Sequence, residues 1–348
     1  MMISNGPLDP PHAPITLRPP RPGRLVFAGE AIVDVVMRVP GLPPRGGDLL
    51  AVSAEVVVGG GFNVMAAAAR QGLPVLYAGG HGTGHWGDLV RAALAAEGIG
   101  LLRPPDPSRD TGFDVALVEP DAERTFVTAL GAESVGERGG WDAVPASPGD
   151  VVYVSGYGLV PPSSGPILGG WAAALPPAVL LFFDPGPLVA QIPPEVLEPV
   201  LARCDWLTCN AREAALLTGV TAKEAALRLL ARTARANVVV RVGPDGCFLA
   251  TRPPASQATR LPAPGTAPAR DAPRPRVTEA PDHIPAPAVQ ALDTTGAGDA
   301  HSGVFLAALA DGLSPVDAVR RANAAAALAV TRPGPATSPT RAELDAWS

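Results

Sequence analysis

Short apolar segments alternate with segments of helical spacing along most of the chain. The strand-like runs are bounded by glycine, proline or polar residues and cover residues 24–39, 73–80, 151–156, 179–186, 205–210 and 237–243. Stretches with helical spacing or composition lie at residues 60–72, 88–98, 166–175, 193–204, 212–219, 222–233, 299–312 and 314–334. Strands that alternate with helices predict right-handed βαβ units and a mostly parallel sheet covered by helices on both faces.

Two segments depart from this alternation. Residues 110–133 alternate apolar and polar positions on both sides of a turn at 119–124, which predicts an antiparallel hairpin. Together with residues 34–58, the strands at 110–130 are expected to form a small antiparallel β lid. The predicted fold class is α/β, a doubly wound and mostly parallel sheet flanked by helices, in one domain at residues 24–340.

Proline-rich segments precede and interrupt this domain. Residues 1–23 lack the apolar core of a signal peptide, and they predict a flexible tail. Residues 251–282 break the alternation and predict an irregular insertion, to which we assign no chemistry. The segment 282–292 is expected to recover strand character before the next helix.

Charge and composition exclude several classes of protein. The formal net charge is −6 without a basic block, so nucleic acid is not expected as a partner. No run of about 18 apolar residues occurs, so no membrane span is expected and the protein is predicted to be cytoplasmic. Cys204 and Cys209 lack the further ligands of a metal site, so reduced thiols are expected. Lys223, the only lysine, follows no glycine-rich loop, which excludes a Walker-type phosphate loop.

The sequence DTTGAGD at residues 293–299 is the strongest candidate for chemistry. Glycines allow consecutive backbone N–H groups to converge, and a helix that begins near Asp299 would place these groups at its positive end. Gly296, Ala297 and Gly298 would then surround an anion, with Asp299 able to take a proton from a neighbouring hydroxyl. This arrangement suits phosphoryl transfer to an alcohol. From spacing alone, a plain strand–turn–helix with an acidic first turn remains the alternative.

A second glycine motif, GTGHWG at residues 82–87, matches the dinucleotide fingerprint of dehydrogenases. Asp106 follows at about the twenty-residue interval that this fingerprint requires. However, Asp106 lies in a proline-rich turn and not at a strand end, and the motif is not in the first strand–helix turn. A dehydrogenase is therefore disfavoured.

Five segments resemble, in order, the signatures of the ribokinase-like (PfkB) carbohydrate kinases. They are GGGFNVMAAAARQG at 59–72, CNAREAALLTG at 209–219, VVVRVGPDGCFL at 238–249, DTTGAGDAHSGVFLAAL at 293–309 and RANAAAALAVTRPG at 321–334. The resemblance spans nearly all of residues 24–335. It implies an ATP-dependent kinase that phosphorylates a primary hydroxyl of a small sugar or sugar-like molecule.

The resemblance also implies roles for three groups of residues. The catalytic group consists of Asp299 as the base and an anion hole formed by Gly296, Ala297 and Gly298. The group that would bind substrate hydroxyls consists of Asp34, Gly60, Gly61 and Asn63. The group around the nucleotide consists of Asn210 and the magnesium ligand Glu213 near the phosphates, and of Gly243, Gly246 and Asn323 near the adenosine.

ATP and Mg²⁺ are the cofactors that the resemblance implies, and a monovalent cation is left open. The expected partners are a small-molecule sugar and a second copy of the chain, bound as a homodimer through the lid. Two other functions stay open: a nucleoside kinase of the same fold, with Phe62 stacked on a base, and a catalytically silent binding or regulatory protein.

Several of these residues also have simpler structural interpretations. Asp34 would cap a turn, and Asn210 would be an N-cap with Glu213 as its capping-box partner. Asn323 would face solvent, while Gly60 and Gly61 would serve helix packing. His301, which follows the expected base, would contact the substrate or pack in the core.

Overall fold

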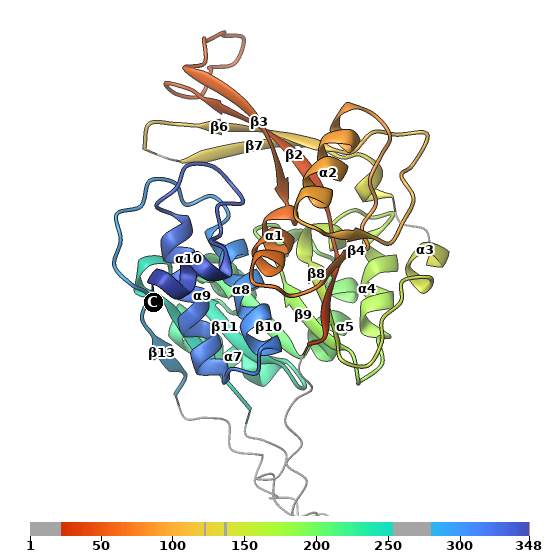
Figure 1. Cartoon of the computed structure of the whole chain (residues 1–348), viewed down its shortest axis with the longest axis vertical. Coiled ribbons are helices and arrows are strands. Elements are labelled where there is room, and N and C mark those ends of the chain that lie inside the picture. The colour runs from red at the N-terminus through yellow and green to blue at the C-terminus, as the bar shows by residue number, and fades with distance from the viewer. Residues whose placement is uncertain (1–21, 122, 136–137, 253–279, 348) are drawn as a thin grey trace, which may run out of the picture.

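The computed structural model describes residues 22–121, 123–135, 138–252 and 280–347. The tail predicted at 1–23 and the insertion predicted at 251–282 fall almost entirely outside these described residues. Figure 1 shows a layered body of strands and helices from which a smaller sheet projects.

The body is built on a sheet that has nine strands within the described ranges. Their order is β13-β12-β11-β10-β9-β8-β1-β4-β5, with parallel pairing from β11 to β5 and an antiparallel edge at β12 and β13. The strands are β1 (Arg24–Ala28), β4 (Val75–Tyr77), β5 (Gly100–Leu101), β8 (Asp150–Ser155), β9 (Leu180–Asp184), β10 (Trp206–Asn210), β11 (Asn237–Arg241), β12 (Cys247–Ala250) and β13 (Asp282–Ile284). The mostly parallel sheet predicted from the alternation is confirmed.

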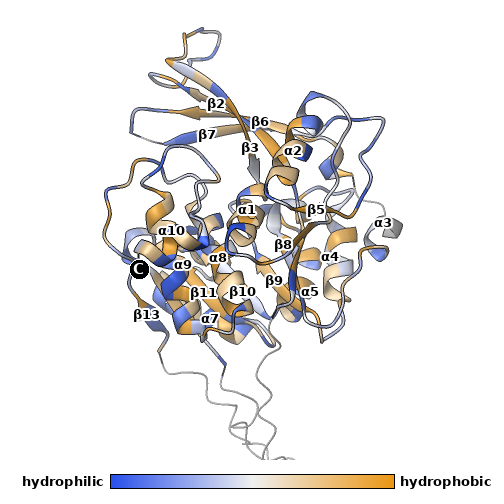
Figure 2. Cartoon of the chain, in the orientation of Figure 1, coloured by the Kyte–Doolittle hydropathy of each residue, from blue (hydrophilic) through white to orange (hydrophobic). Residues whose placement is uncertain are grey.

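Helices cover both faces of this sheet because side chains alternate along each strand. In β8, Val152 and Val154 belong to one apolar cluster, whereas Val151 and Tyr153 belong to another. The first cluster includes α4 (Gly165–Ala173), α5 (Pro194–Arg203), α6 (Ala211–Thr218) and α7 (Ala222–Arg232). The second includes α1 (Phe62–Arg70), α2 (His85–Ala96), α8 (Ala297–Ala310) and α9 (Pro315–Ala329). Figure 2 shows the strands between these helices as mostly hydrophobic, as expected for a buried parallel sheet.

The smaller sheet, which we call the lid sheet, has the strand order β3-β2-β6-β7. Its strands are β2 (Ala31–Arg38), β3 (Ser53–Gly60), β6 (Phe113–Val118) and β7 (Arg124–Ala129). The hairpins β2–β3 and β6–β7 are antiparallel, but β2 and β6 pair in parallel, so the lid expected to be antiparallel is a mixed sheet. The parallel pair arises because the chain passes through α1, β4, α2 and β5 before β6, which is a crossover and not a hairpin.

Two segments near the C-terminus and one near the middle of the chain differ from the sequence prediction. The strand expected at 282–292 is limited to β13, because Pro285 and Pro287 follow and have no N–H to donate to a neighbouring strand. The helix α10 (Arg341–Trp347) was not predicted, and a short helix α3 (Arg138–Asp142) was also missed. Among the described helices, none is both long and apolar enough to cross a bilayer.

Candidate active site

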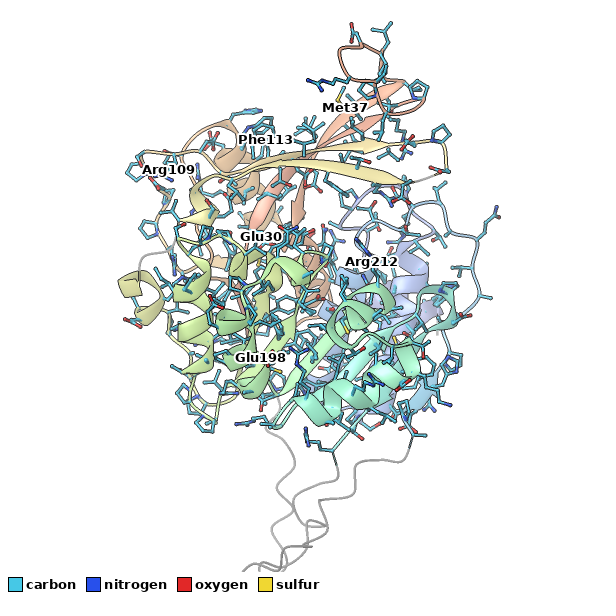
Figure 3. All side chains as sticks on the ribbon, turned by 180° about the vertical axis from the view of Figure 1, so that it is seen from behind. Glu30, Met37, Arg109, Phe113, Glu198 and Arg212 are labelled. Atoms are coloured by element: carbon cyan, nitrogen blue, oxygen red, sulfur yellow. The ribbon has the colours of Figure 1, made fainter. Side chains whose placement is uncertain are left out.

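The structure has a cavity of about 760 Å³ between the lid sheet and the carboxyl ends of the parallel strands. Five consecutive central strands each contribute a polar residue to it at or just after their last position: Glu30 (β1), Ser155 (β8), Asp184 (β9), Asn210 (β10) and Arg241 (β11). Open α/β sheets bind ligands at this edge, because the loops there diverge. Figure 3 shows Glu30 between the lid sheet and the body, which marks the position of this cavity.

The N-terminus of α8 opens onto the cavity. Gly296 is its N-cap with φ 71°, a left-handed conformation that favours glycine, and the helix begins at Ala297. Within the described part of the chain, the N–H groups of Gly298 and Asp299 have no hydrogen-bond partner, whereas the next amide, of Ala300, donates to the Gly296 carbonyl. Unpaired amides at a helix N-terminus favour an anion. The Ala297 N–H, which the sequence analysis placed in the anion hole, instead donates to the Thr294 carbonyl at 3.3 Å, so the amides open to a ligand in the first turn are those of Gly298 and Asp299.

Asp293, the first residue of DTTGAGD, holds the turn that leads into α8. Its carboxylate accepts hydrogen bonds from the N–H of Thr295 at 2.9 Å and from the N–H of Gly334 at 3.1 Å. It also forms an ion pair with Arg124 at the start of β7. The turn is thereby tied to the lid sheet, so that the lid strand and the α8 N-terminus are held together.

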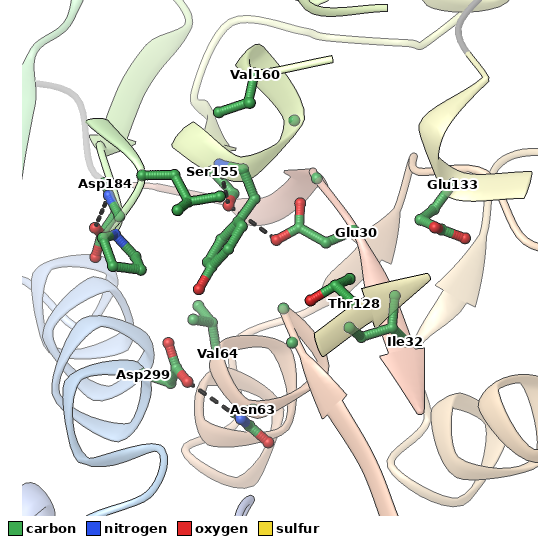
Figure 4. A pocket seen from close by; sticks show the side chains of 18 of the residues that line it. Glu30, Ile32, Asn63, Val64, Thr128, Glu133, Ser155, Val160, Asp184 and Asp299 are labelled. Carbon is green, nitrogen blue, oxygen red and sulfur yellow. Dashed lines mark hydrogen bonds between the residues drawn. The ribbon is translucent and has the colours of Figure 1, made fainter. Parts of the chain in front are cut away.

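Asp299 lies in the first turn of α8, half-buried and facing the cavity (Figure 4). The side-chain amide of Asn63, on α1, donates a hydrogen bond to its Oδ2 atom at 3.1 Å. Burial raises the pKa of the Asp299 carboxyl to about 6; the Asn63 hydrogen bond opposes this shift and the charge of Asp184 adds to it. A carboxylate with a pKa near neutrality is well suited to accept a proton from a hydroxyl.

Arg241, which the sequence analysis missed, supplies a positive charge beside the α8 N-terminus. Its guanidinium donates to the hydroxyls of Thr208 at 2.8 Å and Ser302 at 3.0 Å, and to the Asp184 carboxylate at 3.1 Å. A Cβ atom added at Gly298 would lie 3.5 Å from its Cζ atom. The guanidinium is therefore fixed next to the open amides of the helix.

Asn210 and Glu213 form the capping box that the sequence offered as the simpler interpretation. The Asn210 Oδ1 atom accepts from the Glu213 N–H at 2.9 Å, and the Glu213 Oε2 atom accepts from the Asn210 N–H at 2.7 Å. Both residues nevertheless line the cavity. Glu213 is buried, and burial raises the pKa of its carboxyl; the charge of Asp184 adds to the shift and Arg241 opposes it.

The residues present fit a magnesium ion, although the described residues contain no cluster of three or more acidic, His or Cys side chains. Mg²⁺ is commonly bound by one or two carboxylates together with substrate phosphates, and it keeps several of its waters. Asp184 and Glu213 face the same cavity, the charge of Asp184 raises the pKa of Glu213, and the Arg241 guanidinium lies 3.1 Å from Asp184 and 3.9 Å from Glu213. Each carboxylate oxygen also retains a free lone pair after its hydrogen bond.

The predicted substrate residues Asp34, Gly60, Gly61 and Asn63 all line the cavity. Asp34 lies within β2 and does not cap a turn, so that alternative is wrong. Gly61 also serves packing, because an added Cβ would lie 2.1 Å from the Cζ atom of Phe27. Gly60 has φ 59°, which its turn from β3 into α1 requires.

The predicted adenosine residues lie outside the lining of this cavity. Gly243 and Gly246 form the turn between β11 and β12, both with positive φ, and an added Cβ at Gly246 would lie 2.1 Å from the carbonyl oxygen of Ile284. Asn323 is 3% exposed, so the solvent-facing alternative is wrong. Its side-chain amide donates to the carbonyls of Ile284 at 3.0 Å and Pro285 at 3.2 Å. Asn323 thus fixes the segment that packs against the Gly246 turn.

Two side chains considered for substrate contact are in the core instead. Phe62 is 7% exposed and packs in the apolar cluster under α1, because the helix turns Asn63 and Val64 toward the cavity. Stacking of Phe62 on a base is therefore ruled out as support for a nucleoside kinase. His301 is 3% exposed, lies 3.3 Å from the Cys247 thiol, and has its pKa lowered to about 3 by burial. The packing alternative for His301 is confirmed.

The second glycine motif does not form a dinucleotide site. The carboxylate of Asp110 accepts hydrogen bonds from the N–H groups of Trp86 at 3.1 Å and Gly87 at 2.7 Å, in the first turn of α2. That helix N-terminus is thus already occupied by a side chain. Asp106 is bound to its own loop, accepting from the N–H of Ser108 at 2.8 Å. A dehydrogenase is excluded at this motif.

Comparisons with known proteins agree with this geometry. The model of the pfkB family carbohydrate kinases matches residues 23–342. The chain is 32% identical over 325 residues to the uncharacterized sugar kinase YegV of Escherichia coli K12, which covers 92% of each protein. Among solved structures, ribokinase of Thermotoga maritima has a TM-score of 0.73 at 23% identity and covers 93% of this chain and 98% of its own.

A second solved structure is aminoimidazole riboside kinase of Salmonella enterica in complex with aminoimidazole riboside and an ATP analog. It has a TM-score of 0.71 at 22% identity and covers 93% of this chain and 99% of its own. At this identity the two solved structures establish the fold, a ribokinase-like α/β body with a small lid sheet. The family match over nearly the whole chain and the relative at 32% identity establish more: the chain belongs to the pfkB family of carbohydrate kinases, which are ATP-dependent enzymes.

Proposed function

We propose that the protein transfers the γ-phosphoryl group of ATP to a primary hydroxyl of a small sugar or sugar-like substrate, with Asp299 as the general base. The observation that carries the proposal is the half-buried Asp299 carboxylate beside the unpartnered N–H groups of Gly298 and Asp299 at the start of α8. A proton acceptor and a set of anion-binding donors within one helical turn are the two requirements of this transfer.

The residues of the chain divide the reaction between them. Asp299 accepts the proton of the attacking hydroxyl, and the hydrogen bond from Asn63 fixes the direction in which its carboxylate points. The amides of Gly298 and Asp299 stabilise negative charge on the transferred group, and the Arg241 guanidinium beside Gly298 adds a full positive charge. The lid sheet covers the reacting groups and lowers their contact with water.

Magnesium would be held by Asp184 and Glu213, with Asn210 orienting the Glu213 carboxylate through its 2.8 Å hydrogen bond. The bound ion would supply neutralisation of the negative charge on the phosphate oxygens. We place the adenosine beside the Gly243–Gly246 turn. Asn323 would then act from behind that turn, by holding the Ile284 and Pro285 carbonyls against which Gly246 packs.

The assay that tests this function is ADP release from ATP and Mg²⁺ over a panel of pentoses, hexoses, ketoses and nucleosides. Turnover with at least one sugar supports the proposal. Turnover with nucleosides alone would replace it with the nucleoside kinase, and no ADP release across the panel would favour a silent binding protein.

We also propose that the chain forms a homodimer through the outer face of the lid sheet. Val56, Val35, Val115 and Val127 pair in one cross-strand row. Because Asp34 precedes Val35 in β2 and faces the cavity, this row points to the opposite face. Val56 and Val127 are 50% and 65% exposed. Sedimentation should give twice the chain mass, and Val115→Asp should give the monomer; a monomeric wild type would contradict the dimer.

A further inference from the structure

The part of the cavity beyond Asp299 contains several acceptor atoms that have no partner. They are Glu30 Oε2, Asp34 Oδ1, Asn63 Oδ1 and Asp114 Oδ1, each shielded from solvent and each on a residue that lines the cavity. The four residues come from four places in the fold: the β1–β2 junction, β2, α1 and β6. Buried polar atoms without partners are uncommon in folded proteins, and the convergence of these acceptors on one cavity indicates a ligand that donates hydrogen bonds. The Nε and Nη2 atoms of Arg103, which are donors in the same lining, also have no partner, so the ligand must accept hydrogen bonds as well, as a hydroxyl group does.

These side chains are held in place by the fold. Glu30 receives a hydrogen bond from the Ser155 hydroxyl on its other oxygen, at 3.1 Å, and Figure 4 shows it between Asp184 and Glu133. Asp34 and Asp114 are direct neighbours in the parallel pair β2–β6, and each is 7% exposed. Asn63, a neutral residue, is 5% exposed with its Oδ1 atom unpartnered.

Glycine at position 59 makes room for this arrangement. A Cβ atom there would lie 2.1 Å from the Oδ2 atom of Asp34, so any larger residue would displace the carboxylate from its position. Burial raises the pKa of the Asp34 carboxyl, and the neighbouring charges of Asp114 and Asp299 raise it further. The folded protein therefore keeps these acids close together although their proximity disfavours the ionised form of Asp34.

This region is rich in carboxyl groups. Glu30, Asp34, Asp114 and Glu133 line the cavity, and the described lining contains two cations, Arg103 and the Arg241 beside the α8 N-terminus. The Arg103 guanidinium stacks on the Trp141 ring, 4.1 Å from its centroid. A sugar that carries a carboxylate or phosphate would bring another negative charge against these carboxyl groups.

We infer that Glu30 and Asp114, together with Asp34 and Asn63, recognise an uncharged polyhydroxy substrate through its hydroxyl hydrogens and exclude acid sugars and sugar phosphates. This inference rests on the proposed kinase function and names its substrate class. Each hydroxyl can donate one hydrogen bond to one of the unpartnered acceptors, whereas a carboxylate or phosphate oxygen can donate none. Glu30 and Asp114 are specificity-determining residues in this account, beyond the residues predicted from the sequence.

The experiment compares matched compounds of one carbon skeleton, each with a free primary hydroxyl: ribose with ribonate, glucose with gluconate, fructose with 2-ketogluconate, and glucose with glucose 1-phosphate. For each compound, thermal stabilisation is measured without ATP, and ADP release with ATP and Mg²⁺. The proteins are the wild type, Glu30→Gln, Asp114→Asn and the control Glu123→Gln, which changes an exposed residue in the turn just before β7. Arg103→Met tests whether the guanidinium binds an anion instead.

The expected result is that at least one neutral sugar is bound and turned over with a kcat/KM about 10²-fold or more above its charged partner, since like charges brought together are strongly disfavoured. Asp114→Asn and Glu30→Gln should each lower kcat/KM for the neutral sugar by about tenfold. Each variant should therefore also reduce the ratio of kcat/KM for the neutral sugar to kcat/KM for its charged counterpart. Glu123→Gln should change neither value.

Three results would overturn the inference. The first is a charged compound that is used as well as its neutral counterpart or better, above all if Arg103→Met abolishes that preference. The second is that Glu30→Gln and Asp114→Asn lower kcat/KM equally for the neutral and the charged compound of a pair, and the third is that no neutral sugar binds. Stabilisation by a neutral sugar that is lost in Asp114→Asn, without ADP release, would support the binding inference and contradict the kinase proposal.

Discussion

Asp299→Asn should lower kcat by about 10²–10⁴-fold, the typical contribution of a general base. The reason is that the amide cannot accept the hydroxyl proton, while it can still accept the hydrogen bond from Asn63 through its oxygen. The variant should be as stable as the wild type or more stable. Burial raises the pKa of Asp299 to about 6, which means that the folded protein disfavours the ionised carboxylate relative to the unfolded chain. The measurements are kcat with the best neutral sugar and the melting temperature.

The matched control is Asp311→Asn, at the other end of the same helix. The Asp311 side chain is 39% exposed and forms an ion pair with Arg341 at 2.6 Å. It lies at the C-terminal end of α8, whereas Asp299 lies in the first turn of that helix. This variant should retain wild-type kcat. If Asp299→Asn turned over within a few-fold of the wild type, another group would have to be the base.

Arg241→Lys should produce the second largest effect, a decrease in kcat of about 10²–10³-fold, as seen when one preorganised charge-stabilising donor is removed. Lysine keeps the positive charge but cannot reproduce the fork that bonds Thr208, Ser302 and Asp184 at once. The lysine ammonium group would therefore not be held at the position beside Gly298 that the Arg241 guanidinium occupies. We choose lysine because Arg241→Met would leave Asp184 buried without its cation, at a cost of about 3–5 kcal/mol in stability.

The matched control for Arg241→Lys is Arg203→Lys. Arg203 is also nearly buried, pairs with Asp205 at 2.9 Å and bonds three backbone carbonyls, but it does not line the cavity. Both variants should lower the melting temperature, whereas only Arg241→Lys should lower kcat. Equal kcat values in the two variants would reduce Arg241 to a structural residue.

Much of the fold could be predicted because the period of apolar residues reports directly on local structure. The alternation of strands and helices and the hairpin at β6–β7 both follow from residues close in sequence. The parallel pair β2–β6 could not be predicted in this way. It joins residues 80 positions apart, such as Asp34 and Asp114, and no local pattern predicts that these two residues will be neighbours.

The candidate site was predicted where one motif carries it, and missed where topology assembles it. Asp299 and its glycines are contiguous, whereas Arg241 and Asp184 meet only because β9, β10 and β11 are neighbours in the sheet. A signal for these residues was present: a charged residue ends an otherwise apolar strand in VVVR and in LLFFD. Because parallel strands end at one edge, such residues are expected to converge. Glu30, just after β1, follows the same rule.

The pH dependence of kcat/KM tests the central claim most directly, that Asp299 is the base. Activity requires the ionised carboxylate, whose pKa burial raises to about 6. We therefore expect kcat/KM to fall about tenfold per pH unit below this value. Burial also raises the pKa of Glu30 to about 7, so Glu30→Gln is measured alongside and should retain the decline near pH 6. The residual activity of Asp299→Asn should lack that decline. A wild-type profile that stays flat down to pH 5, or an unchanged decline in Asp299→Asn, would contradict the assignment.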